Sequence, residues 1–455
     1  MNPFVGPSYQ LTSRKADVQR SINWYPVSIE SGSGKSPSML KRAQGLKTFS
    51  ALGSDPVRGS KELNGRAFAV CGSTLYEVDA SGAKTARGTL TTSTGPVSLE
   101  FNQLQLVIVD GSSGYYFTLD TNVFQQITDP DFPICNTVVV VDGYAIVTET
   151  GTGQFNISAI NDASSWATLD FANAEAYPDN VVAPFVIQRQ SYFLGLKSIE
   201  VWTNTGAADF PFQRTGSVLD IGCNSPFTIQ RVGSGVMMFL GSDERGGPVV
   251  WGVEGYLPRR LSTIAIEQSL TGLDLTQASA FAFTVEGSAF YALQVPGLTS
   301  TWVYDFTNSA WHERAEFTNG LFKPWRGSNY VFAFGKHLIG GSDGTLYELS
   351  PGTYQYGNDP IVSDRVSPHE ALPTFQRQRF PKFEVDMTVG SGGLVQMRYS
   401  DDGGNTWGDW RSASMGALGK YSTRVLFWRC GFARDRVWNV RVTDPVQADI
   451  VSVQA

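Results

Sequence analysis

One local pattern repeats through most of the chain and limits its fold more than any single motif does. An apolar run is followed by a turn of Gly with Asp or Ser, and then by a second run rich in β-forming residues. Gly between two β-rich runs is the usual sequence signal of a β-hairpin. The pattern occurs in Phe68–Asp79, Leu106–Asp120, Val138–Glu149, Ser191–Thr203, Val236–Val253, Phe283–Val295 and His337–Leu349. The chain is therefore predicted to be all-β.

The spacing of these hairpins favours one all-β architecture. The turn glycines recur roughly every 30 to 55 residues, the range of propeller blades, and Thr301–Arg314 adds another strand–turn–strand stretch. We therefore expect a β-propeller-like domain over residues 56–350, with six or seven blades. Because the spacing is irregular, the blade number stays open, and so does a stacked β-sandwich. The pattern suggests a single short helix, in Leu261–Leu270.

Two further regions flank the repeats. Residues 1–55 are polar, and Pro7, Pro26 and Pro37 oppose a long helix, so we expect an extended N-terminal arm. Residues 351–455 begin with a turn-rich linker and continue with longer strands of strict alternation, which predicts a C-terminal β-sandwich. The predicted fold class is thus an irregular β-propeller followed by a β-sandwich, with an extended N-terminal arm.

Composition and charge narrow the class of protein. Hydrophobic residues make up 42% and charged residues only 17% of the chain, which has 47 Gly; this is neither a disordered nor a coiled-coil composition. The net charge of −7 argues against tight, sequence-independent DNA binding, which needs a basic surface. A weak contact with double-stranded DNA that passes along the protein remains an alternative. The alternative is that the negative charge only aids solubility.

The cysteines and the N-terminus bear on the compartment. Cys71, Cys135, Cys223 and Cys430 are far apart and show no CxxC spacing, so we expect neither a zinc site nor disulfides, and a reducing compartment fits best. Residues 1–15 have no apolar run after a basic start, so no signal peptide is expected. No apolar run approaches about 18 residues, so no membrane span is expected.

One motif points to a particular hairpin. The stretch YSDDGGNTWGDW places Ser400, Asp402, Gly404, Thr406 and Trp407 in the pattern Ser-x-Asp-x-Gly-x-Thr-Trp, which resembles the Asp-box of sialidases and other β-propeller hydrolases. In such a hairpin the Asp and Thr side chains bond to their own turn. The motif therefore favours a hairpin over catalysis. A carbohydrate-active or sugar-binding propeller remains the alternative, although no motif marks the pair of carboxylates that glycosidases need.

Other catalytic motifs are present only in part. Gly340–Gly344 fits the nucleophile elbow, but strand-like residues follow it where that elbow needs a helix. Gly32–Ser36 imitates a phosphate-binding loop, but Ile29 stands at the first glycine position and Pro37 where the helix should begin. The histidines, which show no metal-ligand spacing, are His312, His337 and His369. We therefore expect no catalytic, cofactor-binding or metal-binding residues, and no cofactor.

Two groups of side chains leave alternatives open. The aromatic run Tyr115–Phe117 could stack on bases or sugars, but packing between sheets is the commoner role. A basic cluster stands out near the C-terminus of an acidic chain. It consists of Arg424, Arg429, Arg434 and Arg436. It either faces a phosphate backbone or an acidic partner subunit, or it forms cross-strand ion pairs.

Several stretches together resemble one family. They are Ser21–Val27, Gly45–Phe49, Pro56–Gly59, Tyr192–Gly206, Ile221–Ile229, Leu257–Glu267, Met397–Trp410 and Trp428–Val442. The sequence is similar to the tail nozzle, or tail hub, proteins of short-tailed bacteriophages, also called packaged-DNA stabilisation proteins. The resemblance runs in order over most of the chain.

The resemblance implies a structural virion protein of the tail, assembled in the host cytoplasm, and not an enzyme. Such proteins form a homohexameric ring on the portal and adaptor proteins of the head–tail connector. The ring extends the DNA channel, helps to retain the packaged genome and allows its ejection. Implied partners are the other subunits, the connector proteins, tail fibre, spike or needle proteins, and passing double-stranded DNA. A receptor-binding or tailspike-associated protein is a weaker alternative. The N-terminal arm and the sandwich are the expected inter-subunit contacts.

Overall fold

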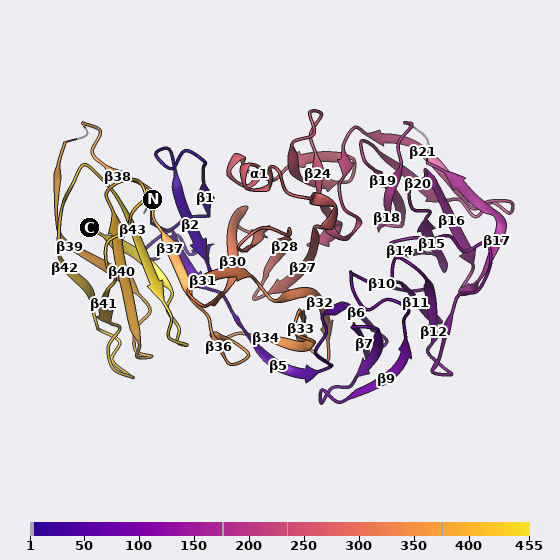
Figure 1. Ribbon diagram of the computed structural model, residues 1–455, viewed down its shortest axis with the longest axis horizontal. Helices are drawn as coiled ribbons and strands as arrows, with labels where there is room; N and C mark the ends of the chain where they lie inside the picture. The colour runs from indigo at the N-terminus through magenta and orange to yellow at the C-terminus, as the bar shows by residue number, and fades with distance from the viewer. Residues whose placement is uncertain (1–3, 175–176, 234, 375) are drawn as a thin grey trace.

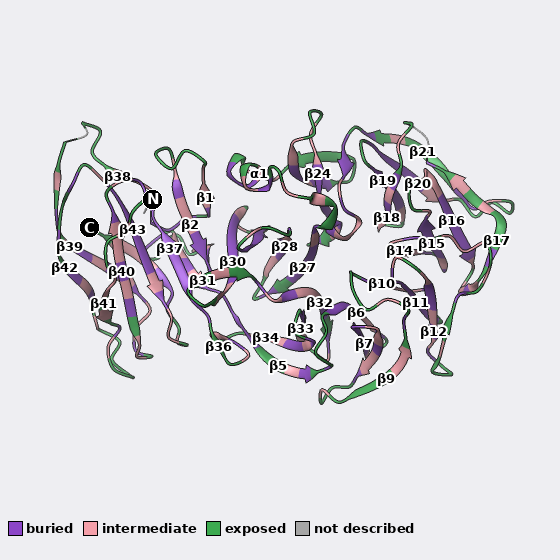
Figure 2. Cartoon of the chain, in the orientation of Figure 1, coloured by how far each residue is buried: buried purple, intermediate pink, exposed green. Residues whose placement is uncertain are grey.

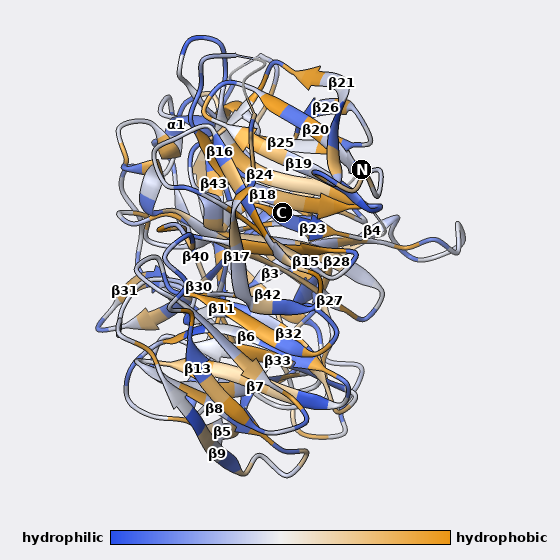
Figure 3. Cartoon of the chain, turned by 90° about the vertical axis from the view of Figure 1, so that its right-hand side faces the viewer, coloured by the Kyte–Doolittle hydropathy of each residue, from blue (hydrophilic) through white to orange (hydrophobic). Residues whose placement is uncertain are grey.

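The computed structural model describes residues 4–174, 177–233, 235–374 and 376–455. Two bodies lie side by side along the longest axis: a ring of small sheets, and a sandwich that contains the C-terminus (Figure 1). Both are built of strands, so the predicted class of a β-propeller followed by a β-sandwich is confirmed. Hydrophobic segments run mainly along the strands, and hydrophilic ones lie mostly in the connecting loops (Figure 3).

Within the described residues the ring has seven blades. The first four are four-stranded antiparallel meanders. Blade 1 consists of β6 (Val57–Leu63), β7 (Arg66–Cys71), β8 (Thr74–Val78) and β9 (Lys84–Thr89). Blade 2 consists of β10 (Ser98–Phe101), β11 (Gln105–Val109), β12 (Gly114–Thr118) and β13 (Val123–Gln126). Blade 3 consists of β14 (Val138–Val141), β15 (Tyr144–Thr148), β16 (Gln154–Ala159) and β17 (Asp162–Asn173). Blade 4 consists of β18 (Val181–Ile187), β19 (Gln190–Gly195), β20 (Ile199–Asn204) and β21 (Phe212–Leu219).

The next two blades carry short helices at their borders. Blade 5 consists of β22 (Gly222–Cys223), β23 (Gln230–Val232), β24 (Val236–Ser242), β25 (Pro248–Glu254) and β26 (Leu257–Arg260), with the 3-10 turn η1 (Pro226–Thr228). Blade 6 consists of β27 (Ser279–Val285), β28 (Ser288–Gln294), β29 (Thr301–Asp305) and β30 (Ala310–Thr318), whose end pairs with β31 (Leu321–Pro324). Between them lie α1 (Ile264–Leu270) and η2 (Leu275–Gln277). The helix α1 confirms the short helix predicted there.

Blade 7 closes the ring with a strand from the other end of the chain. Its inner strands are β32 (Gly327–Ala333), β33 (Lys336–Gly341) and β34 (Thr345–Ser350). Its outer strand is β5 (Gly45–Ala51), which pairs antiparallel with β34. The short strands β35 (Gln355–Tyr356) and β36 (Asp359–Pro360) follow beside β5. The circle of blades is therefore completed by hydrogen bonds between two distant segments.

The hairpin turns explain why the glycine signal repeats. In blade 1 the turn is Asn64–Gly65, with φ of 49° and 81°, and in blade 3 it is Asp142–Gly143, with φ of 50° and 91°. Two-residue turns with positive φ at both positions match the twist of the flanking strands. Gly adopts positive φ without steric cost, and Asn and Asp tolerate it best among the other residues. The recurring turn residues thus mark the blade hairpins correctly.

The sandwich has two sheets. The first contains β1 (Tyr9–Gln10), β2 (Val18–Ile22), β37 (Ser363–Val366), β38 (Glu370–Ala371), β43 (Asp435–Val442), β40 (Leu394–Ser400) and β41 (Arg411–Ser414). The second runs in the order β3 (Trp24–Ser28), β4 (Ser38–Arg42), β44 (Ile450–Gln454), β39 (Gln378–Met387) and β42 (Val425–Ala433). Between the sheets the rings of Phe383 and Trp438 stack with centroids 4.3 Å apart.

The N-terminal segment is extended, but its strands pair within the chain itself. β2, β3 and β4 belong to the sandwich, and β5 belongs to blade 7. Phe4, Val5, Trp24 and Leu40 are buried in the sandwich core. The sequence predicts an extended segment here but not the distant partners of its strands, which lie as far along the chain as Glu313 for β2 and Ile450 for β4. The buried residues of β2 to β5 thus pack within the chain, and the expected contact of this segment with neighbouring subunits stays a prediction.

One sheet joins the two bodies. β2 pairs with β30 of blade 6 on one side, at Ile22 and Glu313, and with β37 of the sandwich on the other. Asn23 donates to Ala315 O (2.7 Å) and to Val362 O (2.9 Å), so its amide bonds to both bodies. Buried segments lie on both sides of the joint (Figure 2). The joint is therefore a packed interface and not a loose linker.

Candidate functional site

The Asp-box-like hairpin bonds to itself. The Asp402 carboxylate accepts from the backbone N of Asn405 (3.0 Å) and Thr406 (2.9 Å), from Thr406 Oγ1 (2.6 Å) and from Ser400 Oγ (2.7 Å). These hydrogen bonds, first of all those from Thr406, place the pKa of Asp402 well below its usual range. A general acid needs a raised pKa and a free proton. The prediction of a self-stabilising hairpin is therefore confirmed.

The tryptophans of this hairpin are also engaged. The Arg398 guanidinium lies 4.8 Å from the ring centroid of Trp407 and 4.3 Å from that of Trp410. Trp407 also packs against a small cluster of buried valines, which contains Val18. Both rings are covered by cations or apolar side chains, so neither is an open platform for a sugar ring.

The hairpin instead contacts the N-terminal loop. Arg14 Nη1 donates to Gly404 O (2.8 Å). The His369 ring bonds to Arg14 O through Nε2 (2.7 Å) and to Asp435 through Nδ1 (2.8 Å). On its other side the same loop reaches the propeller, where Thr12 Oγ1 donates to Gln268 Oε1 of α1 (2.9 Å). The motif thus helps to fasten the sandwich to the propeller.

The basic cluster near the C-terminus divides into two kinds of residue. Arg424 pairs with Glu384 (2.7 Å), and Arg436 pairs with Asp401 (2.6 Å) and is 1% exposed. These two arginines fit the ion-pair interpretation. Arg429 and Arg434 are exposed on the surface of the sandwich. The four residues therefore do not form one site.

The remaining motifs are structural where the described residues allow a decision. Gly340–Gly344 is the β33–β34 turn, as predicted, and Gly32–Ser36 lies in the loop between β3 and β4. His337 bonds to Tyr330 Oη (2.9 Å), whereas both ring nitrogens of buried His312 lack a partner. Among the described residues no three His, Cys, Asp or Glu side chains are grouped so that they could bind a metal.

The aromatic run in blade 2 is mostly core. Tyr115 and Phe117 are buried between blades 1 and 2, and the Tyr115 ring stacks on Phe124 with centroids 5.3 Å apart. Tyr116 is only partly buried and donates to Gln125. Tyr116 also packs against the core cluster that contains Val107 and Val138, so the packing interpretation is correct for all three rings.

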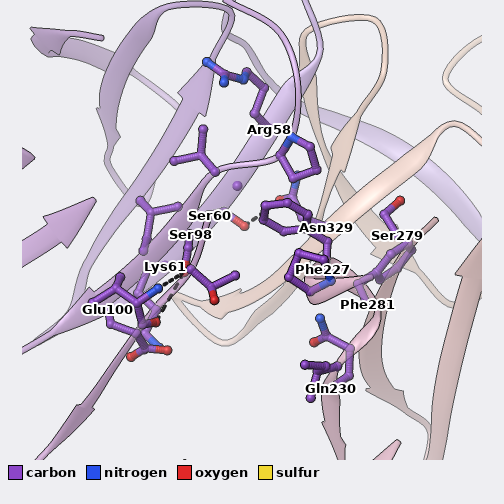
Figure 4. A pocket seen from close by; sticks show the side chains of 18 of the residues that line it. Arg58, Ser60, Lys61, Ser98, Glu100, Phe227, Gln230, Ser279, Phe281 and Asn329 are labelled. Carbon is purple, nitrogen blue, oxygen red and sulfur yellow. Dashed lines mark hydrogen bonds and ion pairs between the residues drawn. The ribbon is translucent and has the colours of Figure 1, made fainter. Parts of the chain in front are cut away.

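The structure reveals a cavity that the sequence does not indicate. It has a volume of about 740 Å³, lies at the centre of the propeller and is lined by residues of all seven blades. Figure 4 shows some of the side chains that line it. Lys61 Nζ pairs with Glu100 (2.8 Å) across blades 1 and 2, and Ser60 Oγ donates to Asn329 (2.6 Å) across blades 1 and 7. Each blade contributes only a few lining residues, so no contiguous sequence motif predicts this cavity.

The side chains that line this cavity are poorly suited to catalysis. Arg58 donates to Gly95 O (2.5 Å), Thr92 O (2.8 Å) and Thr94 O (2.6 Å), and burial lowers the pKa of its guanidinium. Glu100 is the one acid among the lining residues, and Lys61 neutralises it. Glycoside hydrolysis usually needs two carboxylates facing one cleft. The lining therefore does not favour the carbohydrate-active alternative.

A further finding concerns membranes. Within the described ranges, no helix is long and apolar enough to cross a bilayer.

Comparisons with known proteins give mainly family information. No curated protein matches the chain. Among solved structures, the extracellular domain of BT4673 from B. thetaiotaomicron matches with a TM-score of 0.47 at 9% identity, covering 82% of this chain and 48% of that one. The chain thus spans about half of that protein's length. The Pan2 WD40 domain of Neurospora crassa matches with a TM-score of 0.43 at 9% identity, covering 70% of this chain and 97% of that one.

Two family models match the chain. The model described as bacteriophage P22 Gp10, beta-propeller, matches residues 13–354. The model described as bacteriophage P22 Gp10, beta-sandwich, matches residues 372–455. The first match covers the propeller together with strands β2 to β4, and the second covers the sandwich strands from β39 to β44. Together the two matches span most of the sequence. The chain therefore belongs to the bacteriophage P22 Gp10 family of structural tail proteins.

Proposed function

We propose that the chain is a tail nozzle subunit. Six copies form a ring on the head–tail connector, extend its DNA channel, help to retain the packaged genome and allow its ejection. In this proposal the chain is a mechanical part of the virion tail and not an enzyme. The observation that carries the proposal is the joint, where propeller and sandwich share one sheet and buried polar contacts.

The contacts at the joint suit a part that must keep its shape. The buried Glu313 carboxylate accepts from Arg20 Nε (3.0 Å), Ser8 Oγ (3.0 Å) and Ser300 Oγ (2.6 Å). Breaking such a buried pair costs about 3–5 kcal/mol, because one charge is left without a partner. Two bodies connected in this way move as one unit, which is what a channel wall under DNA pressure requires.

A second network lies at the sandwich side of the joint. Arg42 is 1% exposed. Its guanidinium donates to Ser363 Oγ (3.0 Å), Asp444 O (2.7 Å) and Ile361 O (2.6 Å). These acceptors belong to the linker and the C-terminal sandwich, whereas Arg42 belongs to the N-terminal segment. One side chain therefore ties both ends of the chain together.

The expected partners follow from the proposed position. They are the other copies of the chain, the portal and adaptor proteins, a fibre, spike or needle protein at the distal end, and double-stranded DNA that passes without specific binding. A net charge of −7 per copy would repel a duplex if the acidic side chains face the channel. A channel lined mainly by Lys and Arg would contradict this part of the proposal.

Quantitative mass spectrometry of purified virions tests the proposal. We expect about six copies of the chain for every twelve portal subunits, as a closed six-fold ring requires. Purified chain should also fail to turn over glycans. If the chain is absent from virions, or if glycan turnover is lost on changing one carboxylate, the nozzle assignment is wrong.

A further inference from the structure

Charge is distributed very unevenly along this chain. Residues 88–188 contain eleven Asp and Glu and no Lys, Arg or His. Residues 376–455 contain eleven Lys and Arg against eight Asp and Glu. The first segment includes all of blades 2 and 3, and the second forms most of the sandwich. The two segments lie at opposite ends of the longest axis (Figure 1).

The acidic segment has few cationic partners of its own. Among its described carboxylates, only Glu100 and Asp142 form ion pairs, with Lys61 and Arg189. Most of the others accept hydrogen bonds from turns or face solvent. Charge repulsion within blades 2 and 3 is therefore relieved mainly by water, and a basic surface from elsewhere would relieve it further.

The outer edge of blade 3 adds apolar side chains to this negative charge. In β17, Trp166 pairs with Ser158 and Phe171 pairs with Asn156, so residues 167–170 bulge outward. Leu169 in this bulge is 82% exposed, and the neighbouring Phe171 is 39% exposed. The edge is flanked by acidic residues, since Thr168 Oγ1 donates to Asp131 (2.8 Å). We call Asp131, Thr168, Leu169, Asp170 and Phe171 the blade 3 edge.

The sandwich presents the complementary surface. On the outer side of β42, Trp428 is 58% exposed and Phe432 is 52% exposed. Arg379 lies opposite Phe432 on β39, and the Arg377 guanidinium is 5.5 Å from the Phe432 ring centroid. Arg377, Arg379 and Arg429 are exposed, and none of them pairs with a described carboxylate. We call Arg377, Arg379, Trp428, Arg429 and Phe432 the sandwich outer face.

The free edge of β42 is closed to strand addition at this point. Arg411 donates to Trp428 O, and Arg436 donates to Cys430 O. An edge strand whose carbonyls are already bonded is a poor template for another strand. A partner therefore has to bind the side chains of the sandwich outer face and not its backbone.

We propose that the sandwich outer face of one copy binds the blade 3 edge of the next. Exposed aromatic and arginine side chains would meet exposed apolar and acidic ones, which gives both desolvation and charge complementarity. Because the two surfaces differ and lie at opposite ends of one copy, the contact is heterologous, and a heterologous contact gives a closed ring when the rotation between copies closes and an open filament when it does not. This inference rests on the proposed function, whose ring it supplies with an interface.

Two surface variants and their mixture test the inference. The first double variant, Leu169→Arg with Asp170→Arg, disrupts the blade 3 edge. The second double variant, Trp428→Ala with Arg429→Glu, disrupts the sandwich outer face. Wild-type chain should sediment as an oligomer whose mass falls as salt rises, because the contact is partly ionic. Each variant alone should be a monomer. In an equal mixture, the intact sandwich outer face of one variant can bind the intact blade 3 edge of the other. Dimers should therefore form, and nothing larger.

Control measurements distinguish a variant that has lost the contact from a variant that has failed to fold. Leu257→Arg changes a side chain of blade 5 that is 66% exposed and lies outside both surfaces, so its oligomer should equal that of wild type. Circular dichroism should show that all variants are folded. The inference is overturned by a monomeric wild type, by variants that assemble like wild type, or by a mixture that stays monomeric.

Two further outcomes distinguish this inference from the proposed function. If wild-type chain is present in virions at the expected ratio while both variants still assemble, the nozzle assignment stands and this interface is wrong. If the Trp428→Ala, Arg429→Glu variant keeps its mass but loses affinity for a duplex, the sandwich outer face contacts DNA, and the proposed interface is again wrong.

Discussion

The contact between two neighbouring propeller blades and the joint between the two bodies differ in the side chains that they bury. Blade 3 packs Phe155 against Phe193 of blade 4, with ring centroids 4.0 Å apart, and both residues are fully buried. The joint buries Asn23 and Glu313, whose polar groups bond to the backbone and to side chains of both bodies. Apolar packing tolerates small shifts, whereas buried polar networks require one geometry. The comparison suggests that the blades supply stability and the joint supplies a fixed orientation.

The largest expected effect is that of removing residues 1–20. The deletion takes Phe4 and Val5 out of the sandwich core and leaves Glu313 without Arg20. The propeller keeps its closing strand β5, so we expect the sandwich to unfold while the ring stays folded. Limited proteolysis with mass spectrometry should then release sandwich peptides first, and virion assembly should fail. Equal protection of both bodies would show that the N-terminal residues do not stabilise the sandwich.

A single change at the joint should also be costly. Glu313→Ala leaves Arg20 partly buried without its carboxylate, for which we expect a loss of about 3–5 kcal/mol in the free energy of unfolding. Chemical denaturation measures this loss. Glu244→Ala, an exposed acid in the turn between β24 and β25, is the matched control and should change little. A loss below about 1 kcal/mol for Glu313→Ala, the range of surface pairs, would mean that the joint is not fixed by this residue.

The hairpin of the sandwich should show a smaller effect. Ser400 Oγ accepts from the backbone N of Gly404 (2.8 Å) and donates to Asp402. Ser400→Ala leaves the buried Gly404 N–H without a partner, so we expect a loss of about 1–3 kcal/mol. Thermal unfolding of this variant, compared with Ser412→Ala at an exposed serine of the same sheet, tests this expectation. Equal melting temperatures would show that the motif does not stabilise the sandwich.

The smallest effect concerns acid stability at the sandwich surface. Hydrogen bonds from Arg424 and Lys382 lower the pKa of Glu384 from 4.5 to about 2. A carboxylate with a depressed pKa stabilises the fold above its unfolded pKa, and this stability is lost as pH falls through the folded pKa. Between about pH 4.5 and pH 2, wild type should therefore lose more stability than Arg424→Gln. Lys420→Gln serves as the control, and parallel pH profiles of Arg424→Gln and wild type would contradict the expectation.

The sequence predicts elements better than it predicts their partners. The hairpins, the helix α1 and the self-bonded turn at Asp402 depend on neighbours within a few residues, so local patterns reveal them. The pairing of β5 with β34, and of β2 with β30 and β37, depends on segments hundreds of residues apart. Alternation shows which face of a strand is buried, but it does not show against which strand it is buried.

The same limit explains what was missed at the candidate sites. The arginines of the C-terminal cluster look alike in sequence, yet Arg436 is buried beside Asp401 and Arg429 is exposed. Arg429 lies on β42, whose pairing with β39 has a register shift, and it has a positive φ of 58°, whereas Arg436 lies on β43. A single irregular position thus changes which side chains face outward. The central cavity could not be predicted from the sequence, because the residues that line it are spread over seven blades.

The closing strand of blade 7 has a consequence for synthesis of the chain on the ribosome. β34 leaves the ribosome only after nearly 300 residues that follow β5. Until then β5 has no partner in the blade that it completes, and the β3–β4 hairpin likewise waits for its partner strand β44, which is translated later still. Such late, non-local pairing slows folding and exposes strand edges meanwhile. We therefore expect nascent chains truncated before residue 345 to bind chaperones, and completed chains to be released.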